Sequence, residues 1–249
     1  MRVAALYDIH GNLPALDAVL GEIRQAGVEQ IIVGGDVLPG PMPVETLARL
    51  SSFDIPVQFI LGNGEVAVLA EIAGVDAYPL PEQAREVIRW SARQLSAEQA
   101  RLISSWPKTS RLSIDGLGDV LFCHGTPQNE NEIFTRLTPE EVLLPVFEGV
   151  SAPVVVCGHT HMQFDRTVGK TRVVNAGSVG MPFGKPTVDW LLLGPTIELR
   201  HTDYDLEHAA ERIRKTDYPQ AEEFIARNLL HPPSEEEMLK LFARVELKG

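Results

Sequence analysis

Short apolar runs rich in β-branched residues alternate with segments of helical spacing in the first part of the chain. The apolar runs, each closed by turn-forming residues, are residues 2–7, 30–34, 57–61, 119–123 and 153–157. Such runs are typical of strands buried on both faces. Between the first three runs, apolar residues recur at helical spacing over residues 13–26 and 44–50. This alternation of strand and helix predicts a layered α/β fold around a mostly parallel sheet.

The remaining segments differ from this alternating core. A helical insertion is predicted over about residues 65–106, and a further helix over residues 138–147. Short strands separated by Gly-containing turns over residues 163–200 predict antiparallel pairing. Residues 201–249 are predicted to form a helical C-terminal appendage, with helical patterns over residues 205–215 and 220–229 and a capping box that begins at Ser234. Its last helix carries an apolar stripe of Met238, Leu241, Phe242 and Val245. The stripe packs either on the parent domain or on a second copy of the chain in a homodimer.

Composition narrows the class of protein. With 249 residues, 44% of them hydrophobic and 22% charged, the chain has the balance of an ordinary folded protein. Its 34 acidic and 22 basic residues give a net charge of −12, which argues against non-specific nucleic-acid binding. No apolar run is long enough to span a bilayer and the N-terminus does not resemble a signal peptide, so we expect no membrane association. Cys123 and Cys157 each end a predicted buried strand, which indicates free thiols and a cytoplasmic location.

The histidines show where the chemistry is concentrated. Four of the seven directly follow a predicted strand, beside Gly or Asp. In an open α/β sheet the carboxyl ends of the strands border the ligand crevice, so residues from several strand ends converge there. The candidate ligands at these ends are Asp8, His10, Asp36, Asn63, His124, His159 and His161.

This set of side chains predicts a metal centre. Imidazole, carboxylate and amide together suit first-row divalent metals, here manganese, iron, zinc, cobalt or nickel. Seven ligands are too many for one ion, so we expect two divalent ions that share a bridging carboxylate. Asp36, which follows Gly34 and Gly35, is the candidate bridge. Each motif alone has an ordinary alternative as a helix cap, a turn or a core histidine, and the prediction depends on their conjunction at five strand ends.

The motifs occur in a characteristic order. They are Asp8-Ile9-His10, Gly34-Gly35-Asp36, Gly62-Asn63-Gly64-Glu65, His124-Gly125 and Gly158-His159-Thr160-His161. In this order they resemble the calcineurin-like metallophosphoesterase superfamily, especially its small bacterial and archaeal phosphodiesterase branch. The resemblance covers residues 1–200 and implies a four-layer αββα sandwich. It also implies that one metal is held by Asp8, His10, Asp36 and His161. The second metal would be held by Asp36, Asn63, His124 and His159.

The resemblance further implies substrate contacts from Asn12, Asn175 and Ser178. The residues themselves leave alternatives open. Asn12 can equally be the N-cap of the helix that begins near Pro14. Asn175 and Ser178 lie in a Gly-rich turn, where they can be purely structural.

Position 64 departs from the family pattern. The family often has His or Cys after the Gly-Asn pair, and a His there can protonate the leaving oxygen, whereas this chain has Gly64. Without that acid, hydrolysis should favour leaving groups that depart unprotonated, such as aryl esters, over simple alkyl monoesters. Glu65 is expected either to orient a ligand histidine or to serve as an acidic residue at a helix N-terminus.

The sequence as a whole therefore predicts a dinuclear metal-dependent phosphoesterase. We expect a phosphodiesterase first, in which metal-bound hydroxide attacks a small phosphorylated or nucleotide substrate. A phosphomonoesterase, including a protein phosphatase, and a dinucleoside polyphosphate hydrolase are the alternatives within the enzyme class. If the helical insertion and the C-terminal helices wall the crevice, a narrow wall favours small nucleotides over proteins as substrates. A non-catalytic scaffold, like the retromer subunit that shares this fold after losing metal ligands, is disfavoured because every ligand position is filled.

Overall fold

The strands form two five-stranded sheets. The computed structural model describes residues 1–247. The first sheet has the order β10 (Ile197–Thr202), β9 (Val188–Leu193), β1 (Val3–Leu6), β2 (Gln30–Val33) and β3 (Val57–Phe59). The second has the order β4 (Thr109–Ile114), β5 (Gly118–Cys123), β6 (Val154–Cys157), β8 (Thr171–Asn175) and β7 (Phe164–Val168).

The two sheets pack face to face and share a core. Strand β1 shows how, because its four residues are all fully buried and alternate between the two faces of the sheet. Val3 and Ala5 belong to the same buried cluster as Phe122 and other residues of the second sheet, whereas Ala4 and Leu6 belong to the core beneath the helices. A continuous apolar run is therefore required for this strand, which the sequence pattern correctly indicated.

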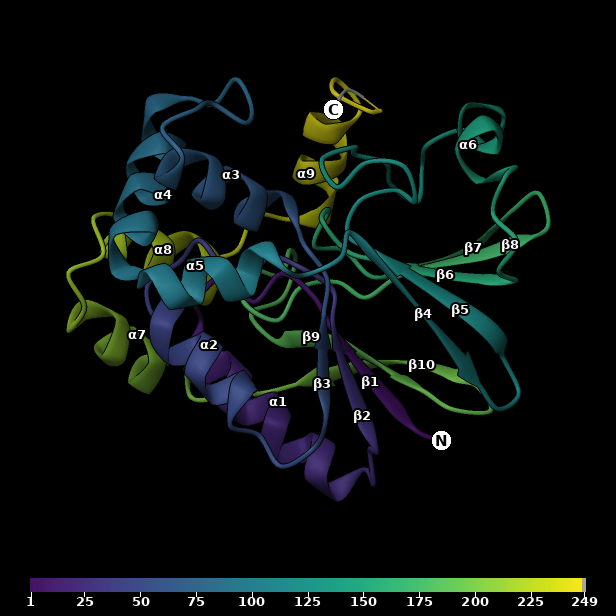
Figure 1. Cartoon of the computed structure of the whole chain (residues 1–249), viewed down its shortest axis with the longest axis horizontal. Helices are drawn as coiled ribbons and strands as arrows, with labels where there is room; N and C mark the ends of the chain where they lie inside the picture. The colour runs from purple at the N-terminus through teal and green to yellow at the C-terminus, as the bar shows by residue number, and fades with distance from the viewer. Residues whose placement is uncertain (248–249) are drawn as a thin grey trace.

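Helices cover the outer face of each sheet (Figure 1). On the first sheet they are α1 (Leu13–Gln25), α2 (Pro43–Ser51), α3 (Asn63–Ile72), α4 (Glu82–Gln94), α5 (Ala97–Ser104), α7 (Leu206–Arg214), α8 (Ala221–Phe224) and the π-helix η1 (Ile225–Leu230). On the second sheet, Leu143 and Phe147 of α6 (Glu140–Phe147) pack on Val155 and Val173. The predicted four-layer αββα arrangement is confirmed.

Strand pairing is more mixed than the predicted, mostly parallel sheet. The β1–β2–β3 and β5–β6–β8 pairs are parallel, whereas β4, β7, β9 and β10 pair antiparallel with their neighbours. The antiparallel hairpins predicted over residues 163–200 are present as β7–β8 and β9–β10. Strand β4 was not predicted, because its half-exposed polar sequence TSRLSI lacks the apolar run that marked the other strands.

The C-terminal segment packs into the main core. Ala209, Ile213, Ile225 and Leu229 are buried in the same hydrophobic cluster as the apolar face of α1. The predicted helix over residues 220–229 is split into a short α-helix and the π-helix η1. The last helix, α9 (Glu235–Phe242), begins with the predicted capping box at Ser234. In the described part of the chain, no helix has the length and apolarity needed to cross a membrane.

Candidate metal centre

Five strand ends meet at one crevice. Asp8 and His10 follow β1, Asp36 follows β2, His124 follows β5, and His159 and His161 follow β6, while Asn63 begins α3 after β3. The structure thus brings together all seven side chains that the sequence singled out as ligands. Their assembly follows from topology, because the carboxyl ends of parallel strands lie at the same edge of a sheet.

The backbone at these positions is unusual. The φ angle is positive at Asp8 (54°), His10 (47°), Asp36 (54°), His159 (66°) and His161 (55°). Non-glycine residues rarely adopt this left-handed region, and a residue held there costs about 1 to 3 kcal/mol. Such conformations gather at functional sites, where the surrounding fold holds side chains in a required direction. Here they turn the chain sharply after each strand and direct the side chains into the crevice.

The first group of ligands consists of Asp8, His10 and His161. His161 Nε2 lies 3.3 Å from Asp8 Oδ1 and 3.3 Å from His10 Nε2, and His10 Nε2 lies 3.9 Å from Asp8 Oδ1. Each histidine is oriented through its other ring nitrogen. His10 Nδ1 donates to the carbonyl of Pro39 at 3.2 Å, and His161 Nδ1 donates to that of Met181 at 2.8 Å. These bonds leave both Nε2 atoms free to bind a metal.

The second group gathers around His124. Its Nε2 lies 2.9 Å from Asn63 Oδ1, 3.5 Å from Asp36 Oδ1 and 3.6 Å from Asp8 Oδ1. Its Nδ1 donates to the Gly34 carbonyl at 2.9 Å, which orients the ring. The His159 ring lies beside it, with 5.1 Å between the ring centroids. Asp8 Oδ1 therefore lies close to both groups, although the resemblance assigned Asp8 to one metal alone.

Asp36 lies between the two groups and points one oxygen at each. Its Oδ2 is 3.7 Å from His10 Nε2, and its Oδ1 is 3.5 Å from His124 Nε2. Gly64 N donates to Oδ1 at 2.7 Å and holds the carboxylate in this orientation. The arrangement is that of a carboxylate able to bridge two cations.

The residues fit divalent cations, because the site contains polar atoms that the protein leaves unpaired. Asp8 Oδ1 and His159 Nε2 are buried without a hydrogen-bond partner, which is unfavourable unless a ligand binds them. Burial opposes ionisation of Asp36, but the charges of His124 and His10 outweigh it and hold the carboxyl pKa well below its usual range. Burial, together with the charge of His124, lowers the pKa of His159 to about 4, so this imidazole is neutral and able to coordinate at neutral pH.

Glu65 supports the site by hydrogen bonding to backbone N–H groups, and not by orienting a histidine. Its fully buried carboxylate accepts hydrogen bonds from the backbone N–H groups of Asp36 (2.8 Å), Gly62 (2.9 Å) and Leu38 (3.1 Å). The prediction that it orients a ligand histidine is therefore replaced by a role in holding the backbone of Asp36. Burial and the nearby charge of Asp36 raise the pKa of Glu65 to about 7.

The structure explains the glycine at position 64. A Cβ placed on Gly64 would lie 2.2 Å from the Leu38 carbonyl oxygen and 2.9 Å from Asp36 Oδ1. Any side chain there, including the histidine that the family often has, would require the Leu38 backbone to move. Gly64 thus permits the close approach of two loops and leaves that position of the crevice without an acid.

The three predicted substrate contacts are fully buried and bonded to the protein. Asn12 Oδ1 accepts from Ala15 N as the N-cap of α1, and its Nδ2 donates to the Gly180 carbonyl. Asn175 Nδ2 donates to the Gly158 carbonyl, and Ser178 Oγ donates to the Asp8 carbonyl. In this arrangement the side chains position the metal-centre loops and offer no surface to a substrate. The structure therefore favours the alternative roles, an N-cap for Asn12 and structural turn residues for Asn175 and Ser178.

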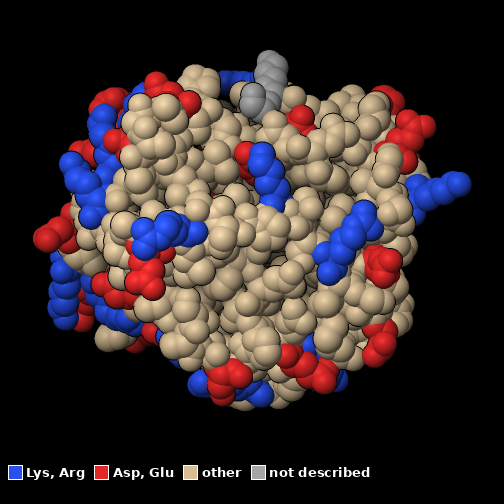
Figure 2. Space-filling view, viewed as in Figure 1, with Lys and Arg blue, Asp and Glu red and all other residues tan. Residues whose placement is uncertain are grey.

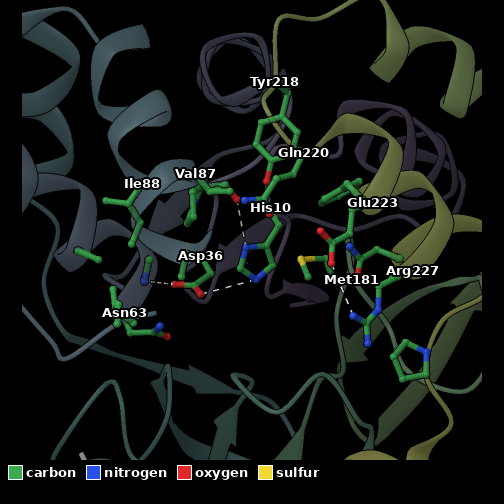
Figure 3. Close-up of a pocket in the computed structure, with 18 of the residues that line it drawn as sticks. His10, Asp36, Asn63, Val87, Ile88, Met181, Tyr218, Gln220, Glu223 and Arg227 are labelled. Atoms are coloured by element: carbon green, nitrogen blue, oxygen red, sulfur yellow. Dashed lines mark hydrogen bonds and ion pairs between the residues drawn. The ribbon is translucent and has the colours of Figure 1, made fainter. Parts of the chain in front are cut away.

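A cavity of about 470 Å³ opens from the metal centre, and the helical insertion and the C-terminal helices wall it (Figure 3). His10, Asp36 and Asn63 lie at one end, and residues of α4 and of the C-terminal helices form the walls. Phe183 connects the metal end to the walls, because it lines the cavity and its ring stacks on the candidate ligand His161, with 5.4 Å between centroids. The sequence suggested that these segments wall the crevice, but apolar helical faces do not show which of their residues line it.

Comparison with known proteins identifies the family and supports the fold. A profile of the calcineurin-like phosphoesterase superfamily domain matches residues 1–194. Strand-end loops, an Asp/His/Asn ligand set and the two-sheet sandwich together define a metal-dependent phosphoesterase. The chain belongs to the calcineurin-like phosphoesterase superfamily.

Similar proteins span almost the whole chain. An uncharacterized protein of Methanocaldococcus jannaschii, MJ0912, is 27% identical over 238 residues, which cover 88% of this chain and 94% of that protein. The crystal structure of a metallophosphoesterase from Sphaerobacter thermophilus is 25% identical with a TM-score of 0.68, covering 91% of this chain and 98% of that one. That of the hypothetical protein PH1004 from Pyrococcus horikoshii has a TM-score of 0.78 at 20% identity, covering 94% and 99%.

Proposed function

We propose that this protein is a dinuclear metal-dependent phosphodiesterase that acts on small phosphoesters. The observation that carries the proposal is the Asp36 carboxylate, whose two oxygens face His10 Nε2 at 3.7 Å and His124 Nε2 at 3.5 Å. One carboxylate between two separate groups of ligands is what a pair of cations requires. When bound, two divalent ions supply positive charge for the phosphoryl oxygens and lower the pKa of a water molecule.

The chain's own residues position these groups and restrict water. Asp8, His10, Asp36 and His161 would hold one ion, and Asp36, Asn63, His124 and His159 the other. The side chains of His10, His161 and Asp36 are only 12%, 11% and 4% exposed. Weak solvation strengthens the electrostatic interactions inside the site.

The walls of the cavity favour a small substrate over a phosphoprotein. The metal end of the cavity is walled by the helical insertion and the C-terminal helices, so a folded protein surface would have to enter between them. Dinucleoside polyphosphates and small phosphomonoesters stay as the alternative substrates. Gly64 supplies no proton to a leaving group, which supports activated esters as the best substrates.

Two further parts of the proposal concern the cell and the assembly. Cys123 and Cys157 are buried and unpaired, which supports a reducing cytoplasmic location. On the face in Figure 2, Lys and Arg are interspersed with Asp and Glu, and this mixture supports a role without non-specific nucleic-acid binding. A homodimer through the C-terminal helices stays a prediction, and Leu241 of α9 is 50% exposed there.

The test is metal-dependent turnover. Chelated protein is refilled separately with manganese, zinc, nickel and magnesium and assayed with an activated aryl phosphodiester and its matching monoester. We expect diester hydrolysis with a transition metal and two bound ions per chain by mass spectrometry. The variant Asp36→Asn should lose both the hydrolysis and the binding of two ions. The control is Asp54→Asn, an exposed carboxylate that pairs with Arg24 and should leave activity unchanged. Two bound ions without turnover of any ester would instead favour the scaffold.

A further inference from the structure

The cavity beside the metal centre has a composition of its own. Its walls include Leu80, Val87 and Ile88 of the insertion, Met181 beside the Gly-rich turn, and Tyr218 and Met238 of the C-terminal segment. Val87 and Ile88 are each 8% exposed, so they form part of the folded core and are not a loose surface. Most of this wall is apolar, in contrast to the carboxylates and imidazoles at the metal end.

The wall is built by contacts between distant segments. Gln220 Nε2 donates to the Gln83 carbonyl at 2.9 Å and to Glu86 Oε2 at 3.1 Å, which ties the C-terminal segment to α4. Tyr218 packs edge-on against Trp90 of α4, with 5.2 Å between the ring centroids. The cavity is therefore a preformed feature of the tertiary structure.

Beyond the metal end, the charged side chains that line the cavity are Glu223 and Arg227. In Figure 3, Glu223 and Arg227 lie on the opposite side of the cavity from Asp36 and Asn63, with His10 between them. Their side chains are 49% and 67% exposed, and Arg227 Nη1 lies 3.6 Å from Glu223 Oε1. Because the negative charge of Glu223 largely offsets the positive charge of Arg227, this end of the cavity is not suited to binding a second phosphate.

We infer that the cavity is a specificity pocket that receives an uncharged aromatic or apolar group of the substrate. This inference rests on the proposed function, since the phosphoryl group would lie at the metal end next to His10, Asp36 and Asn63. The volume of about 470 Å³ falls in the range of small-molecule sites. An apolar group gains by leaving water there, whereas the hydroxyl groups of a sugar would lose hydrogen bonds against Val87, Ile88 and Met181.

Binding of phosphonates tests the pocket independently of turnover. Phenylphosphonate and methylphosphonate share the anionic group and have a carbon–phosphorus bond that phosphoester hydrolysis does not cleave. Titration calorimetry on the manganese-loaded protein should show at least tenfold tighter binding of phenylphosphonate, which corresponds to about 1.4 kcal/mol. Equal affinity for the two, or binding of neither, would overturn the inference.

Variants test whether the preference for phenylphosphonate arises in the pocket. Ala84 lines the cavity from α4, and Ala84→Phe should reduce the preference for phenylphosphonate to less than threefold by filling it. Ala226→Phe places the same ring at an exposed position outside the cavity and should keep the preference. Met238→Gln, which changes polarity at nearly constant size, gives a second test should Ala84→Phe not fold. An unchanged preference in both pocket variants would refute the assignment.

A parallel assay separates this inference from the proposed function. The diesters p-nitrophenyl phenyl phosphate and p-nitrophenyl methyl phosphate release the same leaving group and differ in the retained group. If both diesters are hydrolysed with equal kcat/KM and the two phosphonates bind equally, the proposed phosphodiesterase activity is supported and the specificity pocket is refuted. Selective phosphonate binding without hydrolysis of either diester supports the pocket and contradicts the phosphodiesterase.

Discussion

Glu65 offers the sharpest test of how the fold supports the metal centre. Its carboxylate accepts three hydrogen bonds from buried backbone N–H groups, those of Asp36, Leu38 and Gly62, at 2.8, 3.1 and 2.9 Å. Asp36 at the same time has the strained φ of 54°. Replacing Glu65 with Ala removes the acceptor for all three donors and the support of the strained loop.

The expected loss of stability follows from these bonds. A buried donor left without a partner costs about 1 to 3 kcal/mol. Water that enters the vacated space satisfies part of the need, so we expect Glu65→Ala to lose about 3 to 5 kcal/mol in total. Glu65→Gln keeps one oxygen for Asp36 N and Gly62 N but turns an amide toward Leu38 N, and should lose about 1 to 3 kcal/mol. A second effect is metal binding, which should weaken about 10- to 100-fold because a positioning partner of Asp36 is lost.

Urea unfolding of chelated protein measures the first effect, and calorimetric titration with manganese measures the second. The matched control is Glu71→Ala, an exposed glutamate on the same helix α3, which should change stability by less than about 0.5 kcal/mol. If Glu65→Ala loses no more stability than Glu71→Ala and binds manganese as the wild type does, the reasoning about backbone support is wrong.

Three further outcomes follow from the structure. In chelated protein, the pKa of Glu65 is raised from 4.5 to about 7, so the folded state retains a proton that the unfolded chain loses. The stability advantage of the wild type over Glu65→Gln should therefore decline by about 1 to 3 kcal/mol as pH rises from 4.5 to 7. Urea unfolding measured across that pH range tests this, and the absence of a decline would mean that the pKa of Glu65 is ordinary. The Cβ of Gly64→Ala would lie 2.2 Å from the Leu38 carbonyl oxygen, so this variant should lose about 1 to 3 kcal/mol of stability in thermal melts and bind manganese more weakly. In the control Gly21→Ala, the Cβ enters open space on α1 and should stabilise the protein slightly. Removing residues 204–249 uncovers the apolar face of α1, and the truncated chain should lose cooperative unfolding by circular dichroism; a truncated chain that melts cooperatively would mean that the C-terminal segment is a separable unit.

Local patterns were sufficient for the buried strands and for the types of candidate ligand. The runs at 2–7 and 153–157 are apolar throughout because both faces of β1 and β6 are buried, and burial on both faces is visible in sequence. Asp-x-His and Gly-His-Thr-His were recognisable because a metal demands particular donor atoms, whatever the surrounding fold. Strand β4 was missed because an edge strand with a solvated face carries no such run.

Roles that depend on distant partners were not visible. The sequence allowed Glu65 to orient a histidine or to stand at a helix start, and only the structure shows its bonds to Asp36 and Leu38. Asn175 and Ser178 could have faced a phosphate, but the fold buries them beneath the metal-centre loops. For polar side chains, the choice between binding a ligand and bonding the protein is decided by which backbone groups lie nearby.

What the sequence by itself determined is the chemistry of the centre, namely which donor atoms stand at the strand ends and which position lacks an acid. Those properties reside in side-chain identity and short-range spacing. The tertiary structure alone decided that β9 and β10 return to pair beside β1, and which residues of α4, of the segment around Tyr218 and of α9 line the cavity next to the metal centre. Apolar helical faces are nearly interchangeable in sequence, because hydrophobic burial has no direction of its own and the partner of each face is selected only when the whole chain packs.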